Sequence, residues 1–389
     1  MSPLTPILLL AAAAAQTPAP AIDYAGDAQA LDRLVVKNYA YEDHWPGGVL
    51  PDSPVLAAER AAVHDQRSLL HYAEHRTQSL ADHHAITGSS FKDSWAVVPT
   101  YADLWVERRG SDYVITAVRN GSPAEAADIR AGDMLVAVAG TPTSQAVDRF
   151  WRELGLGVTD ERADYAARVL AAGRRDRPRD LSILHGGRTR RLTLANLYAT
   201  QADRPPVTVV RRAGTPVIRI NNSLGDQATI ATFDAAMAAL PRKAPLVIDL
   251  TDTPSGGNTS VARAMMGWFV NGPRSYQVHR LAAEERETGI PRQWMEQVLP
   301  RSGKFHAALP LVVVGRWTGS MGEGVAIGFA ALGARVEGTR MSQLKGAVYD
   351  FPLPSSKLVV KLPAERLYTV GGLPREKFVP QPVRQATAR

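Results

Sequence analysis

The stretch from Leu311 to Leu332, LVVVGRWTGSMGEGVAIGFAAL, decides the fold of the second half of this chain. Its first apolar run predicts a buried strand, and the apolar, small-residue run after Ser320 predicts a helix. Ser320 therefore lies where the strand turns into the helix. At that position its hydroxyl is accessible, and the first N–H groups of the helix point at whatever binds beside it.

A second turn of the same kind lies upstream, in the segment 245–258, PLVIDLTDTPSGGN. An apolar strand ends there in a Pro/Gly turn, and the pattern after it predicts another helix. The pair Gly256 and Gly257 lets backbone N–H groups approach an oxyanion without obstruction by a Cβ atom. Many α/β proteins contain a plain turn of this type, so the pair alone does not establish a site.

Lys345 follows in the segment LKGAV, 344–348. A lysine that is desolvated beside a serine can lose its proton near neutral pH and serve as the base for that serine. Taken singly, Ser320 is better explained as a helix-capping serine and Lys345 as a surface lysine, so further motifs are needed to support a site.

Together, these segments resemble the tail-specific (C-terminal-processing) serine peptidases. The resemblance implies a crotonase-like α/β core with Ser320 as nucleophile and Lys345 as base. It also implies an oxyanion hole made by the N–H groups of Gly256 or Gly257 and of Met321. The residues that match the family motifs are Asp249, Leu250, Pro254, Gly256, Gly257, Thr318, Ser320, Glu323, Lys345, Gly346 and Val348.

The chain departs from the family pattern around both loops. Thr251 and Thr253 replace the family's Arg and Asn, Ser255 separates the proline from the glycine pair, and Tyr349 replaces a Gln. We expect the Tyr349 hydroxyl to hydrogen-bond Lys345 in place of that Gln. Tricorn-like and nisin-resistance-type relatives instead use a histidine from an Asp-x-His motif, which Asp82-His83-His84 matches. Lys345 is thus the expected base and His84 the alternative.

The middle of the chain resembles a bacterial PDZ module. The segment 121–142 contains a short helical pattern, an Ile-x-x-Gly-Asp turn and an apolar strand. Residues 143–177 predict a helical insertion, and a hairpin around 185–187 closes the module. Such modules capture a peptide C-terminus by strand addition, but a rigid spacer with a closed groove is also consistent with the sequence.

We therefore predict an α/β fold in four parts. Residues 1–15 are a signal peptide, 16–100 an N-terminal helical subdomain, 101–200 a β-rich PDZ-like domain with a helical insertion, and 204–389 the serine peptidase core of repeating ββα units. Within the core, the segment 290–299 is expected to be helical.

The composition is that of an ordinary soluble globular protein, with 45% apolar and 21% charged residues. The absence of cysteine excludes disulfides and thiol catalysis. Although the net charge is +7, acidic residues are interspersed among the basic clusters, so no nucleic-acid binding is expected. The short apolar N-terminal run predicts a periplasmic or secreted protein without stable membrane insertion, and no cofactor is expected.

The segment 71–75, HYAEH, matches the inverted zincin pattern His-x-x-Glu-His. His71 and His75 would share one helical face and could hold Zn²⁺. No third ligand is identifiable on a downstream helix, so no metal site is predicted.

The sequence thus predicts an exported serine endopeptidase that hydrolyses peptide bonds of proteins or peptides. The alternative is a catalytically inactive peptide-binding protein with the same PDZ and peptidase folds. The departures at Thr251, Thr253 and Tyr349 are its main support.

Overall fold

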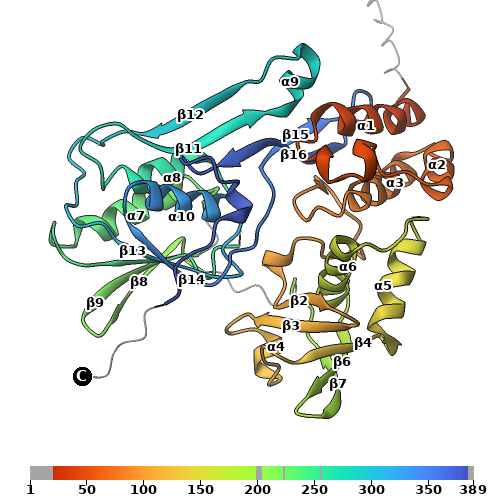
Figure 1. The fold of residues 1–389 in the computed structure, drawn as a ribbon, viewed down its shortest axis with the longest axis horizontal. Helices are drawn as coiled ribbons and strands as arrows, with labels where there is room; N and C mark the ends of the chain where they lie inside the picture. Colours follow the sequence, from red (N-terminus) through yellow and green to blue (C-terminus); the bar gives the residue numbers. More distant parts are fainter. Residues whose placement is uncertain (1–20, 199–203, 222–223, 255, 384–389) are drawn as a thin grey trace, which may run out of the picture.

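The computed structural model describes residues 21–198, 204–221, 224–254 and 256–383. Figure 1 shows an N-terminal helical part, a β-rich part below it and a larger α/β core beside both. The predicted signal peptide lies outside the described residues. Within the described ranges, no helix is long and apolar enough to cross a bilayer.

The N-terminal part contains helices α1 (Tyr24–Asn38), α2 (Pro54–Ala61) and α3 (Gln66–Ser79). Their starts are capped by Asp23, Ser53 and Asp65, whose side chains accept backbone N–H bonds. The helices bury apolar faces that include Leu31 of α1 and Leu69 of α3. All three helices lie within the segment predicted to be an N-terminal helical subdomain.

The β-rich part has the strand order β2-β3-β4-β6-β7, with β5 paired to β4. Its strands are β2 (Leu104–Arg109), β3 (Asp112–Val118), β4 (Met134–Val138), β5 (Thr141–Pro142), β6 (Arg179–His185) and β7 (Arg188–Leu194). Helices α4 (Pro123–Ala126), α5 (Thr143–Arg152) and α6 (Asp160–Ala172) complete it. The predicted helical insertion is thus α5 and α6, and β6 and β7 form the predicted hairpin.

The core contains a five-stranded sheet in the order β14-β13-β10-β9-β8. Strands β9 (Thr215–Ile220), β10 (Val247–Asp249), β13 (Leu311–Val314) and β14 (Arg335–Gly338) run parallel. Strand β8 (Val207–Arg212) is antiparallel to β9. The helices of these units are α7 (Ala228–Ala238), α8 (Thr259–Met266) and α10 (Met321–Ala331).

A second sheet has the order β1-β16-β11-β12, with β15 also paired to β16. Its strands are β1 (Ile86–Thr87), β11 (Arg274–Leu281), β12 (Gln293–Val298), β15 (Ala347–Pro352) and β16 (Val359–Tyr368). Helix α9 (Ala282–Thr288) follows β11. Residues of both sheets and of α8 and α10 form one apolar core, and β1 joins the N-terminal part to it.

One predicted element of the core is wrong. The segment 290–299, expected to be helical, contains strand β12, which pairs antiparallel with β11. The hydrogen bonds that β11 offers to this segment are long-range, and local spacing cannot reveal them.

Candidate active site

Ser320 directly precedes α10, at the end of the turn that follows β13. Its backbone has φ 51° and ψ −112°, a region that side-chain-bearing residues rarely occupy. The buried Thr318 holds the turn, since its hydroxyl donates to the Leu250 carbonyl at 2.7 Å and accepts the Gly315 N–H at 2.9 Å. The turn thus fixes Ser320 in a strained conformation beside the N-terminus of a helix.

A buried carboxylate, that of Glu323, supports this turn. Burial raises the pKa of Glu323 to about 7, although neighbouring donors and Arg375 oppose the rise. Its oxygens accept N–H bonds from Ser320 at 3.0 Å, Gln343 at 2.9 Å and Leu344 at 3.1 Å. One side chain therefore connects the Ser320 turn to the segment that precedes Lys345.

The two glycines of the upstream loop differ in their surroundings. A Cβ atom on Gly256 would lie 2.5 Å from Ser320 Oγ and 3.8 Å from the Met321 nitrogen. On Gly257 it would lie 1.9 Å from the carbonyl oxygen of Leu224. Gly256 therefore faces the serine and the first N–H of α10, whereas Gly257 packs against the backbone of Leu224 and Gly225, a segment distant in the sequence.

Lys345 and Ser320 are not joined by a hydrogen bond in the described structure. The Lys345 ammonium instead donates to Glu161 of α6 at 2.9 Å, and lies 3.5 Å from His44 Nδ1. The Tyr349 hydroxyl donates to Glu365 at 2.5 Å, so the expected bond between Tyr349 and Lys345 is absent from the described contacts.

His84 lies next to the same segment, because its Nδ1 is 2.6 Å from the Lys345 carbonyl oxygen. That carbonyl can only accept, so Nδ1 carries the proton and Nε2 has the free lone pair. Burial lowers the pKa of His84 to about 4, with the hydrogen bond to Lys345 opposing the shift. The imidazole is therefore neutral at neutral pH. Asp82 orients the turn by accepting the His84 N–H at 2.8 Å.

The similarity of this chain to known proteins agrees with the arrangement. Residues 114–149 match the family described as PDZ domain. The solved structure of a photosystem II D1 C-terminal processing protease is 17% identical, with 94% of each chain covered and a TM-score of 0.56. Mature CPAF is 15% identical, with 92% of each chain covered and a TM-score of 0.57.

This chain has the fold of the C-terminal processing proteases. The predicted α/β fold class with a PDZ domain is thereby confirmed. A structure of mature CPAF complexed with lactacystin is also similar, with 14% identity, 92% and 93% coverage and a TM-score of 0.56. No curated protein sequence matches the chain.

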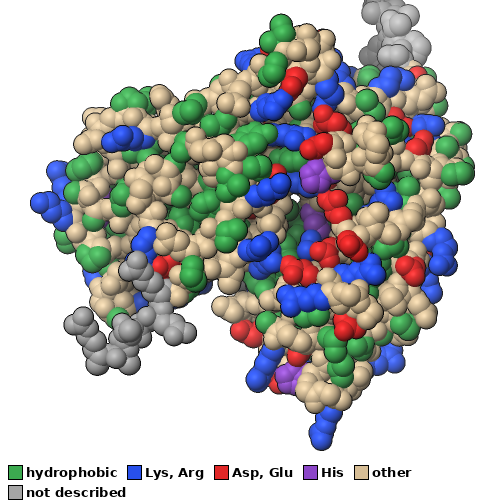
Figure 2. Space-filling model, viewed as in Figure 1, with side chains coloured by type: hydrophobic (Ala, Val, Ile, Leu, Met, Phe, Trp, Pro, Cys, Tyr) green, Lys and Arg blue, Asp and Glu red, His purple; other side chains and the backbone are tan. Residues whose placement is uncertain are grey.

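Within this processing-protease fold, sequence reasoning missed the partners of Lys345. Glu161 belongs to the helical insertion of the PDZ-like part, and His44 to a short 3-10 turn, Glu42–His44, after α1. Three separate parts of the chain thus meet at Lys345. Figure 2 shows a hollow where these parts adjoin, with basic, acidic and histidine side chains around it. No motif marks Glu161 or His44, since their role depends on how the parts pack.

The edge of the PDZ-like sheet at β2 is covered by α6. The Arg108 N–H donates to Asp164 at 2.6 Å, and Arg168 Nε donates to the Val106 carbonyl at 3.1 Å. A peptide that adds to a sheet needs these backbone groups free. At this edge the structure therefore favours the rigid spacer over peptide capture.

A cleft of about 1050 Å³ separates the PDZ-like part from the ends of the parallel strands. Its lining includes Val118 and Arg119 on one side, and Asp252, Pro254 and Trp317 on the other. Arg119 binds Asp252 at 2.8 Å across it. Because Pro254 belongs to the Gly256 loop, a chain bound in this cleft would lie close to the candidate site.

Proposed function

We propose that this protein is a serine endopeptidase that hydrolyses peptide bonds of proteins or peptides. The observation that carries the proposal is the strained Ser320 at the start of α10, with Gly256 facing its hydroxyl. In the proposed reaction, Ser320 Oγ attacks the peptide carbonyl. The N–H groups of Gly256 and Met321 then hold the oxyanion, where each donor typically contributes about 3 kcal/mol.

For the base, the hydrogen-bond partners of the two side chains favour His84 over Lys345. The His84 Nε2 has a free lone pair and the ring is neutral at neutral pH, so it can accept a proton. The Lys345 ammonium is instead engaged in an ion pair with Glu161 at 2.9 Å. Lys345 remains the alternative base, and its use requires that this ion pair open.

A second candidate function is peptide binding without turnover. It is favoured by the absence of a hydrogen bond between Ser320 and either candidate base in the described structure, together with Thr251, Thr253 and Tyr349 at the departing positions. Export to the periplasm or the medium is also part of our proposal, on the basis of the apolar segment 1–15 alone.

The decisive experiment measures hydrolysis of an unfolded protein by the full chain, with mass spectrometry of the products. We expect internal cleavage, and a loss of at least about a thousandfold in Ser320→Ala. Ser260→Ala, on the exposed first turn of α8, is the matched control and should keep full activity. No cleavage by the parent protein would favour the peptide-binding function, and an active Ser320→Ala variant would exclude Ser320 as nucleophile.

A further inference from the structure

The two histidines of the HYAEH segment lie together on α3. The rings of His71 and His75 are 4.2 Å apart. Both carboxylate oxygens of Glu59 lie 2.9 Å from His75 Nδ1. One possible ligand atom from each of these three residues lies within 4.8 Å of the others.

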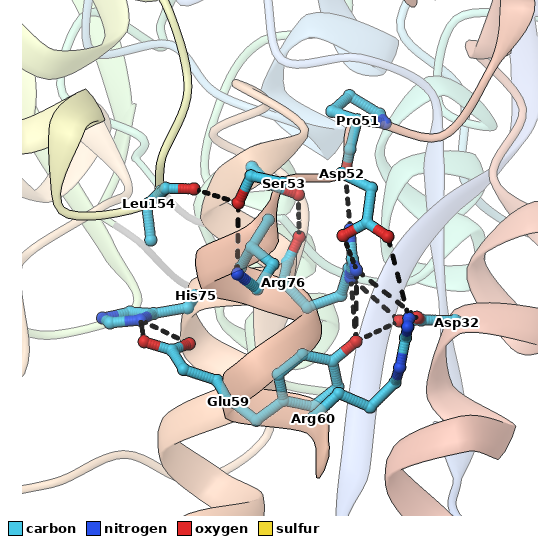
Figure 3. Close-up of polar contacts among 12 residues, drawn as sticks. Asp32, Pro51, Asp52, Ser53, Glu59, Arg60, His75, Arg76 and Leu154 are labelled. Atoms are coloured by element: carbon cyan, nitrogen blue, oxygen red, sulfur yellow. Dashed lines mark hydrogen bonds and ion pairs between the residues drawn. The ribbon is translucent and has the colours of Figure 1, made fainter. Parts of the chain in front are cut away.

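Glu59 comes from α2, which precedes α3 in the chain. The expectation that no metal binds here rested on the lack of a third ligand downstream. Figure 3 shows Glu59 and His75 facing each other across the two helices. The third donor therefore comes from α2, the helix that precedes α3 in the chain.

The helices that carry these ligands are held firmly in place. Arg76 of α3 is fully buried and binds Asp32 of α1 at 2.8 Å and Asp52 at 3.1 Å. Arg60 of α2 pairs with the same Asp32. Figure 3 shows this cluster next to the Glu59–His75 pair. A ligand set on braced helices loses little entropy when it binds a metal ion.

The donor types select the class of metal. Two imidazoles and one carboxylate suit Zn²⁺ and similar transition-metal ions, whereas Mg²⁺ and Ca²⁺ prefer oxygen donors alone. Beside the histidines lies a cavity of about 310 Å³, whose lining includes Glu74 and Ser94. It leaves room for water at a fourth position, next to a carboxylate.

An ion pair between Glu59 and His75 does not explain the whole arrangement. It leaves the second imidazole, His71, tilted against His75, with no ion pair or hydrogen bond of its own to a carboxylate among the described residues. A shared cation accounts for all three side chains. We propose that Glu59, His71 and His75 bind one Zn²⁺ ion that links α2 to α3.

The test is calorimetric titration of ZnCl₂ into the full, EDTA-treated chain, with metal content measured after dialysis. We expect one Zn²⁺ per chain and a higher Tm with Zn²⁺, but not with Mg²⁺. Glu59→Gln, His71→Gln and His75→Gln should each weaken binding by at least about tenfold. Unfolding of each variant in EDTA shows whether it is folded before the titration.

His185→Gln is the matched control, because His185 also pairs with a carboxylate, Asp133, at 2.6 Å, but belongs to no three-ligand cluster among the described residues. It should bind Zn²⁺ as the parent does. The proposal would be overturned if the parent did not bind Zn²⁺, or if folded Glu59→Gln and His71→Gln bound Zn²⁺ as tightly as the parent. Peptide hydrolysis is not the readout, so this result stands apart from the peptidase test.

Discussion

The nucleophile turn and the base region of the candidate site are built in different ways. Ser320, Thr318 and Glu323 come from one strand–turn–helix unit, and Gly256 comes from the neighbouring unit of the same parallel sheet. Lys345 is held by Glu161 of α6 and His44 of the N-terminal part. His84 also comes from the N-terminal part.

This difference separates a geometry set within the core from one that depends on how the parts of the chain pack together. The nucleophile turn is held by buried hydrogen bonds within the core, so its geometry follows from the core fold. The base region depends on contacts among three parts of the chain, some of them exposed ion pairs that are individually weak. The nucleophile turn should therefore tolerate changes elsewhere better than the base region.

Replacing the two candidate bases gives the largest expected difference. With His84 as base, His84→Ala should lower kcat/KM by about 10²- to 10⁴-fold. Lys345→Ala should then cost only a few-fold, because its side chain faces Glu161. The measurement is kcat/KM for a short peptide at neutral pH, and the reverse pattern would assign the base to Lys345.

The pH profile of the parent protein provides an independent check on the base. With a pKa of about 4 for His84, activity should rise as the pH increases through that value and remain high at neutral pH. A lysine of ordinary pKa, about 10.4, would give activity that rises only in the alkaline range. A profile that is flat at neutral pH and falls on acidification supports His84.

The two glycines test the nucleophile turn. Gly256→Ala keeps its backbone N–H but places a Cβ 2.5 Å from Ser320 Oγ. The hydroxyl or the loop must then shift out of alignment, so activity should fall by about 10²- to 10³-fold, as when an oxyanion donor is lost. Gly257→Ala instead forces a Cβ onto the Leu224 carbonyl, so it should lower Tm. Thermal unfolding and peptide hydrolysis on both variants separate these effects. A Gly256→Ala enzyme with full activity would contradict the proposed oxyanion hole.

Glu323→Gln tests the link between the two regions. In the parent, several donors share the two carboxylate oxygens of Glu323. The glutamine amide has only one acceptor oxygen, so at least one buried N–H loses its partner. We expect the free energy of unfolding to fall by about 1–3 kcal/mol. Chemical denaturation measures this, with the exposed Glu287→Gln as control. Equal stability of the two variants would show that the Glu323 contacts are dispensable.

Glu161→Gln should have the smallest effect. Burial opposes the shift, but His44 and Lys345 lower the pKa of Glu161 to about 2. Its ion pairs thus stabilise the fold above the ordinary pKa of a glutamate, and this contribution is lost as the pH falls toward 2. Because the side chain is 47% exposed, we expect Glu161→Gln to lower the free energy of unfolding by less than about 1 kcal/mol at neutral pH.

Denaturation of Glu161→Gln at neutral and acidic pH measures this contribution. The difference in free energy of unfolding between the variant and the parent should shrink as the pH falls. If Lys345 were the base, its release would also raise activity, which is not expected with His84.

The amino-acid sequence by itself determined the α/β core, the PDZ-like part and the position of Ser320 at a strand-to-helix turn. These features depend on local patterns: apolar runs of strand length, small-residue helices and Gly-rich turns. The helical character of the segment that contains α1 to α3 could be predicted for the same reason. The β-structure of β12 could not be predicted, because its hydrogen bonds are made with β11, which local sequence patterns do not reveal.

Only the tertiary structure decided which side chains surround the candidate site. Gly256, rather than Gly257, faces Ser320 because the backbone at Leu224 occupies the other side of the loop. Glu161 reaches Lys345, and Glu59 reaches His75, from helices whose sequences carry no motif for these roles. Such pairs form between segments far apart in the chain, and their distance depends on packing, which residue spacing does not encode.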